Sequence, residues 1–213
     1  MKKTFISLLT GLMIICGSSN ISTGAGTLGK EQQLLEQVTK YSAYSDNEDK
    51  REVINNVINK LCNTITNKKI IENIKEYRVN LLDVENLEEQ GDFTIIGWCN
   101  YVNKKIDVAF YMNDEDLYTT FFHEIGHAID CEYGESRITE DKKYIDIYCK
   151  ESDLVAPKYL SKNNYKYYRD SLREYFAQSF AKYMYIHDKG FEDTETYKYI
   201  DRIVKGECYD KVS

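Results

Sequence analysis

The chain has 213 residues, of which 42% are hydrophobic and 30% are charged, and its formal net charge at pH 7 is −7. This length and composition are typical of one globular domain with a sizeable core, and they argue against an intrinsically disordered chain. The acidic charge argues against nucleic acid and anionic membrane surfaces as partners, because both repel a negatively charged protein.

Residues 1–25 have the pattern of a secretory signal peptide. Lys2 and Lys3 precede an apolar run over residues 5–15, and the Thr-Gly-Ala sequence at 23–25 offers small side chains at the usual cleavage positions. The apolar run is too short to span a bilayer, so we expect no stable membrane insertion. The pattern predicts a secreted, extracellular protein.

The mature chain is expected to be a single domain of residues 26–213 that acts as a monomer. Loss of the two signal lysines lowers the net charge of −7 by two, to −9. Cys16 is a possible lipid-attachment site, although Ile15 occupies a position that usually needs a small residue. A form anchored at the cell surface through Cys16 is therefore the alternative to a released protein.

The cysteines give no metal-binding spacing of the CxxC type. Five remain after cleavage, an odd number that leaves at least one thiol unpaired unless chains couple: Cys62, Cys99, Cys131, Cys149 and Cys208. A disulfide between Cys131 and Cys149 is the first pairing to test in an exported protein. The alternative is that the cysteines are small buried hydrophobic residues.

Two segments in the first third of the chain have the apolar spacing of helices and predict a helical N-terminal part that serves as scaffold. The first covers residues 31–44, with Leu34, Leu35 and Val38 as its apolar positions. The second covers residues 47–65 behind an acidic first turn, and its apolar positions are Val53, Ile54, Val57, Ile58 and Leu61.

Residues 92–112 are rich in β-branched and aromatic side chains and are interrupted by a polar pair at Asn103-Lys104, which predicts a β-hairpin. In its second arm the apolar residues alternate with others, as in a half-buried strand: Ile106, Val108, Phe110 and Met112. Together with the helices, the hairpin predicts an α+β fold with a small mixed or antiparallel sheet.

A helical period begins near residue 113 and is expected to end near Tyr133-Gly134. Its apolar stripe consists of Tyr118, Phe122, Ile125 and Ile129. The segment "FFHEIGHAID" lies on this helix and contains two of the three histidines in the chain, His123 and His127. Gly126 lies between them, and because an interior helical glycine costs about 1 kcal/mol relative to alanine, it indicates close packing by a strand or a substrate backbone.

His123 and His127 lie one turn apart on the same helix face, so their imidazoles can converge on one cation. Glu124 is rotated by about a quarter turn and is better placed to act as general base on an activated water. Zinc suits imidazole and carboxylate ligands, and a catalytic zinc keeps one of four positions open for water. The motif predicts one Zn²⁺ and a third protein ligand; the alternative is an exposed helix whose histidines align by chance.

Glu174 is the best candidate for the third ligand. It lies in a second long amphipathic helix predicted over residues 165–186, on a face whose other members are small or polar: Ser171, Ala177, Gln178 and Ala181. Tyr167 lies seven residues earlier, two turns back on the same face, where its phenol could donate to the oxyanion of peptide hydrolysis. A solvated surface glutamate is the alternative for Glu174.

Three other residues are weaker candidates for the third ligand. His187 near the end of the second helix is better explained as an exposed residue at a helix C-terminus. Cys131 lies one turn beyond His127, but burial explains it more simply than ligation. Asp130 is better suited to a hydrogen bond with a ligand or to a helix cap.

The segments "HEIGHAID" and "YYRDSLREYFAQSFAKYM" resemble the catalytic domain of anthrax toxin lethal factor and its smaller secreted relatives, the Pro-Pro endopeptidases. The resemblance is specific over residues 106–185. It implies a zincin-like metalloprotease fold in which His123, His127 and Glu174 hold zinc. It also implies that Glu124 is the general base and that Tyr167 stabilises the oxyanion.

The resulting expectation is a secreted zinc metalloendopeptidase that hydrolyses peptide bonds in extracellular or surface proteins, with a preference near proline implied by the resemblance alone. The strand over residues 106–112 is expected to align the extended substrate backbone. An exported zinc-containing binding or adhesion module without proteolytic activity is the alternative, and a zinc hydrolase of non-peptide substrates is a third possibility.

Overall fold

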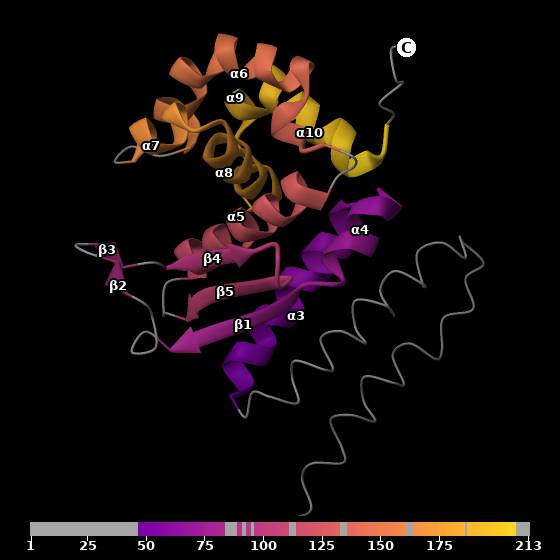
Figure 1. The fold of residues 1–213 in the computed structure, drawn as a ribbon, viewed down its shortest axis with the longest axis vertical. Coiled ribbons are helices and arrows are strands. Elements are labelled where there is room, and N and C mark those ends of the chain that lie inside the picture. The colour runs from indigo at the N-terminus through magenta and orange to yellow at the C-terminus, as the bar shows by residue number, and fades with distance from the viewer. Residues whose placement is uncertain are drawn as a thin grey trace, which may run out of the picture.

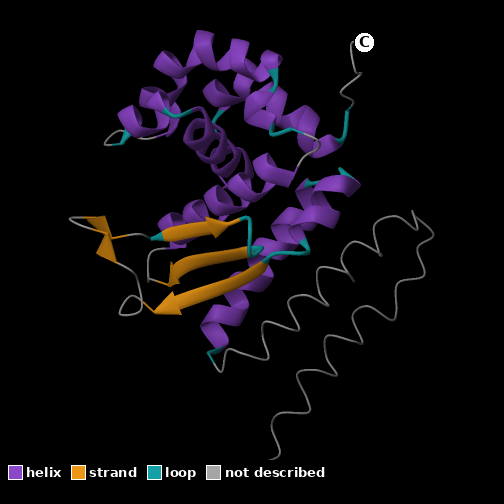
Figure 2. Cartoon of the chain, in the orientation of Figure 1, coloured by secondary structure: helices purple, strands orange, loops and turns teal. Residues whose placement is uncertain are grey.

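The computed structural model describes residues 47–83, 89–90, 93–94, 96–110, 114–132, 136–160, 164–185 and 187–207. The fold is α+β, as predicted, with one small mixed sheet and a larger set of helices (Figures 1 and 2). Its helices are α3 (Glu48–Thr64), α4 (Lys68–Ile74), α5 (Asp114–Glu132), α6 (Lys142–Val155), α7 (Tyr165–Asp170), α8 (Leu172–Tyr185), α9 (Lys189–Glu192) and α10 (Glu195–Lys205). Its strands are β1 (Arg78–Asp83), β2 (Glu89–Gln90), β3 (Phe93–Thr94), β4 (Gly97–Asn100) and β5 (Lys105–Phe110).

Helix α3 forms where the apolar spacing predicted it. The side chain of Asn47 accepts hydrogen bonds from the backbone N–H groups of Asp49 and Lys50, which satisfies donors that a helix N-terminus leaves without partners. The predicted apolar face is buried, with Val57 and Leu61 almost fully enclosed. The signal peptide and the predicted helix over residues 31–44 lie outside the described residues.

The predicted hairpin is confirmed by β4 and β5, which pair antiparallel. Strand β1, which the sequence reasoning did not predict, pairs parallel with β5, so the strand order is β1-β5-β4. Strand β5 is therefore central, and the prediction that it aligns the substrate is wrong, because both of its edges are already paired. Among the described strands, the one with an open edge beside α5 is β4 (Figure 1).

Helix α5 has the predicted bounds to within about two residues, and the predicted stripe lies in the core, with Phe122, Ile125 and Ile129 buried. In Figure 1 this helix lies between the sheet and helices α6 to α10. Among the described residues, no helix is long and apolar enough to cross a membrane.

The segment between α5 and α7 contains a further helix, α6. A 3₁₀ turn (Ile138–Glu140) leads into α6, and a π-helical turn (Ala156–Leu160) that contains the single proline follows it directly. Asp141 caps α6 by accepting from the backbone N–H of Lys143.

The prediction of one continuous helix over residues 165–186 is wrong. The backbone of Ser171 is extended, with φ −126° and ψ 113°, and it separates α7 from α8. Helix α7 has no buried residue, whereas the middle of α8 is buried on nearly all sides. Tyr167 and Glu174 therefore lie on two different helices and not on one face of a single helix.

The described cysteines form no disulfide, so the pairing of Cys131 with Cys149 is wrong. Cys149 is exposed, and Cys62, Cys99 and Cys131 are partly buried.

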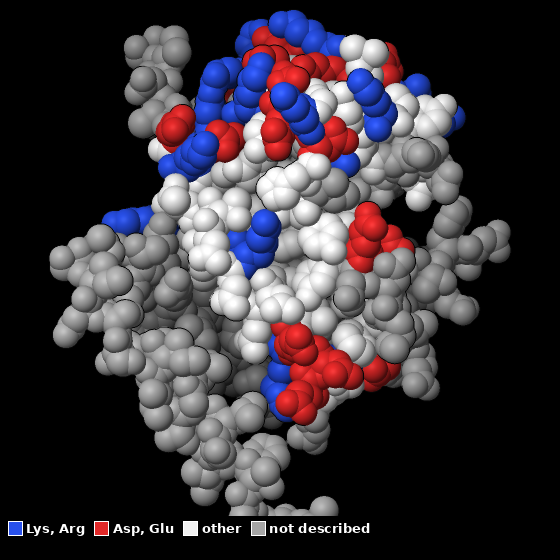
Figure 3. Space-filling view, turned by 180° about the vertical axis from the view of Figure 1, so that it is seen from behind, with Lys and Arg blue, Asp and Glu red and all other residues white. Residues whose placement is uncertain are grey.

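Charged side chains of both signs are mixed at the top of the face shown in Figure 3, and a broad area below them carries few charges. The described part of this face has no basic stripe of the kind that binds nucleic acid.

Candidate metal centre

Helices α5 and α8 cross at a point where neither carries a bulky side chain. A Cβ added to Gly126 would lie 2.9 Å from the Cα and 3.2 Å from the backbone oxygen of Ala177. The glycine thus allows the two backbones to approach closely, as its position inside a helix indicated. The close neighbour is a helix, and not the strand or substrate backbone that was predicted.

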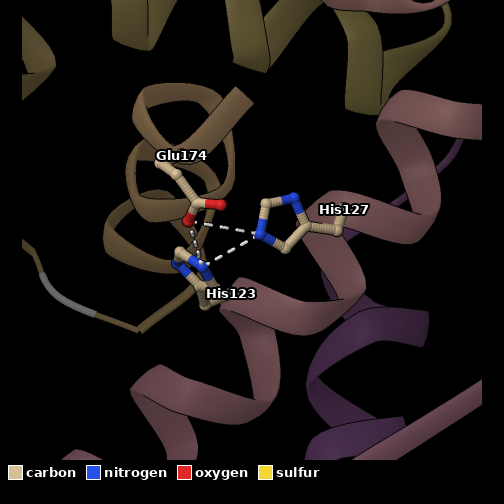
Figure 4. A group of neighbouring side chains, drawn as sticks. All are labelled: His123, His127 and Glu174. Atoms are coloured by element: carbon tan, nitrogen blue, oxygen red, sulfur yellow. Dashed lines mark hydrogen bonds and ion pairs between the residues drawn. The ribbon is translucent and has the colours of Figure 1, made fainter. Parts of the chain in front are cut away.

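This crossing brings His123 and His127 of α5 to Glu174 of α8 (Figure 4). The two Nε2 atoms are 3.1 Å apart, and Oε2 of Glu174 lies 3.1 Å from Nε2 of His123 and 3.4 Å from Nε2 of His127. All three side chains are between 12% and 19% exposed. The cluster therefore presents two imidazole nitrogens and one carboxylate oxygen to a common point.

The charges in the cluster are coupled. Burial raises the pKa of the Glu174 carboxyl, but hydrogen bonds from the two histidines outweigh burial and hold the pKa well below its usual range. Burial lowers the pKa of His123, yet the hydrogen bond and charge of Glu174, together with the charge of Glu124, raise the pKa overall. A metal must displace the proton that this raised pKa favours, so metal binding weakens as the pH falls.

Gln178 fixes the orientation of His123. Its Oε1 lies 2.9 Å from Nδ1 of His123, so the amide oxygen accepts a hydrogen bond from the protonated Nδ1. When His123 becomes neutral, the proton held by Gln178 stays on Nδ1, and Nε2 is left unprotonated and directed at Glu174 and His127, which is the state a metal ligand needs. The sequence placed Gln178 on the face of Glu174 but gave no sign of this contact.

Glu124 lies beside the cluster without belonging to it. Its side chain is only 6% exposed, and its carboxylate accepts a hydrogen bond from the backbone N–H of Cys99 on β4. Burial raises the pKa of this carboxyl, while the positive charges of His123 and His127 lower it in part. A buried carboxylate next to a candidate metal site, but outside its set of ligand atoms, is placed to accept a proton from a water at that site.

Two neighbouring tyrosines of α7 approach the cluster. Tyr167 is 57% exposed and hydrogen-bonds to Glu174. Partial burial of the hydroxyl, together with Glu174, raises the pKa of the Tyr167 phenol. The group therefore stays neutral and able to donate. The ring of Tyr168 packs edge-on against His123 with 6.0 Å between ring centroids. Tyr167 therefore approaches the cluster through its hydroxyl, and Tyr168 approaches it through its ring.

A comparison with protein-family models matches residues 30–203 to the family described as anthrax toxin lethal factor, N- and C-terminal domain. The match covers well over half of the chain. The chain belongs to this family. The predicted family resemblance is therefore confirmed. A comparison with curated proteins found no match.

The lethal factor family is associated with a zinc metalloprotease, and it suggests zinc as the metal for the cluster. The donor set fits zinc, because two imidazoles and one carboxylate are typical protein ligands of a catalytic zinc that leaves one position for water. No distance in the cluster conflicts with a single ion held by His123, His127 and Glu174, since their ligand atoms all lie within 4.8 Å of one another.

The other third-ligand candidates of this lethal factor family member lie elsewhere. His187 has an 83% exposed side chain and is 4.0 Å from Glu192. The carboxylate of the fully buried Asp130 accepts from the backbone N–H and the hydroxyl of Thr139, at 2.8 and 3.0 Å. Cys131 accepts a long contact from Nη2 of Arg173, at 3.6 Å. Among the described residues, only Glu174 joins the two histidines.

Proposed function

We propose that this protein is a secreted zinc metalloendopeptidase with a zincin-like catalytic domain over residues 26–213, and that it cleaves extracellular or surface proteins as a monomer. One observation carries the proposal. Three ligand atoms of His123, His127 and Glu174 converge, and the buried carboxylate of Glu124 lies beside them without being part of the cluster. A purely structural zinc site does not require such a carboxylate.

His123, His127 and Glu174 would hold the zinc ion. When bound, zinc acts as a Lewis acid that polarises the substrate carbonyl and lowers the pKa of water to about 7. The protein supplies the fixed geometry, because Gln178 orients His123 and the α5–α8 crossing fixes the distance between the histidines and Glu174.

Glu124 moves the proton in this proposal. Its carboxylate takes a proton from the attacking water and then gives it to the nitrogen of the leaving amine, so that the amide bond breaks without forming a free amide anion. Tyr167 donates a hydrogen bond from its phenol to the oxyanion that develops on the carbonyl oxygen, a role that needs a neutral donor.

The open edge of β4 is suited to hold the substrate backbone. The backbone N–H of Ala109 donates to the carbonyl of Ile96 at 2.8 Å, so this opposed pair is hydrogen-bonded. Because bonded and non-bonded pairs alternate in an antiparallel ladder, the backbone groups of Gly97 and Cys99 point away from β5. The N–H of Cys99 donates to the Glu124 carboxylate, so an extended peptide that adds to this edge would pair with the backbone of Gly97.

The experiment that tests the proposal is cleavage of a peptide library, including proline-containing sequences, by the residue 26–213 protein and by its Glu124→Ala variant, with zinc measured in both. We expect both proteins to bind one zinc and only the unmutated one to cut, with the library giving the specificity. Zinc binding by both without any cutting would instead favour an exported binding module.

A further inference from the structure

Gly97 on β4 faces the N-terminal half of α5, at the point where the strand passes Glu124. A Cβ added to Gly97 would lie 2.5 Å from Oε1 and 3.0 Å from Cγ of Glu124, and 2.7 Å from the Cγ2 methyl of Thr120. Real Cβ atoms essentially never have neighbours under 3.0 Å, so any side chain here would displace the carboxylate, the methyl group or the strand.

Cys99 lies two residues along the same strand, and its backbone N–H donates to the Glu124 carboxylate. Residues two apart in a strand have the same orientation in the sheet. One short stretch of β4 therefore provides both the space for the carboxylate and the hydrogen bond that holds it. Glu124 is also only 6% exposed, so the carboxylate cannot swing out into solvent without leaving this packing.

We propose that Gly97 is a positioning residue for Glu124. The missing side chain lets the carboxylate lie against the edge strand, hydrogen-bonded to Cys99, at the distance from the metal cluster that proton transfer needs. The inference rests on the proposed hydrolytic function and adds a residue that is neither a metal ligand nor a proton carrier. Displacement of a catalytic group by about 1 Å can cost roughly 100-fold in rate.

Gly97→Ala is therefore expected to lower kcat by about 100-fold, with a smaller change in KM and an unchanged zinc content. Gly190→Ala is the matched control, because a Cβ there would also come closer than 3.0 Å to a side-chain atom, the Tyr159 hydroxyl at 2.6 Å, in elements that supply none of the site residues. That control should cut peptides like the unmutated protein.

Two double variants separate an effect on Glu124 from general strain on the strand. Gly97→Ala with Thr120→Ser removes the methyl contact at 2.7 Å but leaves the contact with Glu124, so its kcat should stay low. Gly97→Ala with Glu124→Asp shortens the acid and relieves the contact. Glu124→Asp should therefore cost less activity in the Gly97→Ala protein than in the unmutated one.

The test is to measure kcat, KM, zinc content and melting temperature for these variants on a peptide that the unmutated protein cuts. Recovery of kcat by Thr120→Ser, or full activity of Gly97→Ala, would overturn the role of Gly97 and leave the protease proposal standing. An unmutated protein that cuts no peptide overturns both. If Gly97→Ala loses its fold, the double variant with Thr120→Ser replaces it, and loss of fold in both shows that the glycine serves folding instead.

Discussion

The crossing of α5 and α8 and the short helix α7 both supply side chains to the candidate site, but they are held in different ways. At the crossing, Gly126 lies against the backbone of Ala177, and the surrounding residues of α8 are buried. Helix α7 has six residues and none of them is buried. It is held to α6 by the hydrogen bond from the Tyr148 hydroxyl to the carbonyl of Arg169.

This difference matches two separate roles, metal binding at the crossing and hydrogen-bond donation from α7. The proposed metal ligands lie on long helices whose spacing is fixed by backbone contact, as an ion with short and directional bonds would require. Tyr167 lies on a helix without a buried residue, and the extended Ser171 separates it from the proposed ligand Glu174. We therefore expect changes at the crossing to affect metal binding and stability, and changes in α7 to affect turnover alone.

The largest effect is expected from Glu174→Gln, which removes the carboxylate ligand from the crossing. Replacing a residue that only hydrogen-bonds to a ligand typically costs about 10–100-fold in metal affinity, and loss of the ligand itself should cost more and abolish activity. Zinc affinity can be measured by competition with a chelating indicator. Glu192→Gln, which changes a partly exposed carboxylate on α9, is the control. Full zinc affinity in Glu174→Gln would remove this residue from the site.

The next effect is expected from Tyr167→Phe. Loss of one oxyanion donor typically lowers kcat by about 10²–10³-fold, and zinc content should not change because the tyrosine is not a ligand. Tyr168→Phe is the matched control, since it keeps the ring that packs against His123 and loses only the hydroxyl. Steady-state kinetics of both variants decide between the two tyrosines, and a larger loss in Tyr168→Phe would transfer the role to that residue.

The smallest effect is expected from Gly126→Ala. Alanine gains about 1 kcal/mol in helix propensity. Overpacking against the Ala177 backbone costs roughly 1–3 kcal/mol. The net result should be a modest loss of stability with weaker zinc binding, measured by urea unfolding and chelator competition. A variant more stable than the unmutated protein, with the same zinc affinity, would show that the helix spacing does not depend on this glycine.

The crossing could be predicted largely from the sequence, because its residues obey the helical period. The four-residue spacing of the two histidines and the small or polar face around Glu174 both indicated helices that approach one another. The break at Ser171 could not be predicted in this way. The apolar period continues through it, and neither proline nor glycine marks it, so tertiary packing decides the local conformation.

The edge strand shows a second limit of sequence reasoning. Both arms of the hairpin were visible in the sequence, but which arm is central depends on β1, which joins β5 from a distant part of the chain. The alternation of apolar and polar residues shows which side chains of a strand face the core, but it does not show which strands pair with its two edges. A glycine inside the strand, Gly97, was the one local sign that another group approaches β4 closely.

The central claim is that His123, His127 and Glu174 together hold one zinc ion, and zinc X-ray absorption on the zinc-loaded protein tests it most directly. We expect only nitrogen and oxygen ligands at about 2.0–2.2 Å, and a changed spectrum in Glu174→Gln. A sulfur ligand at about 2.3 Å, which would bring Cys131 into the site, or a spectrum that Glu174→Gln leaves unchanged, would contradict it.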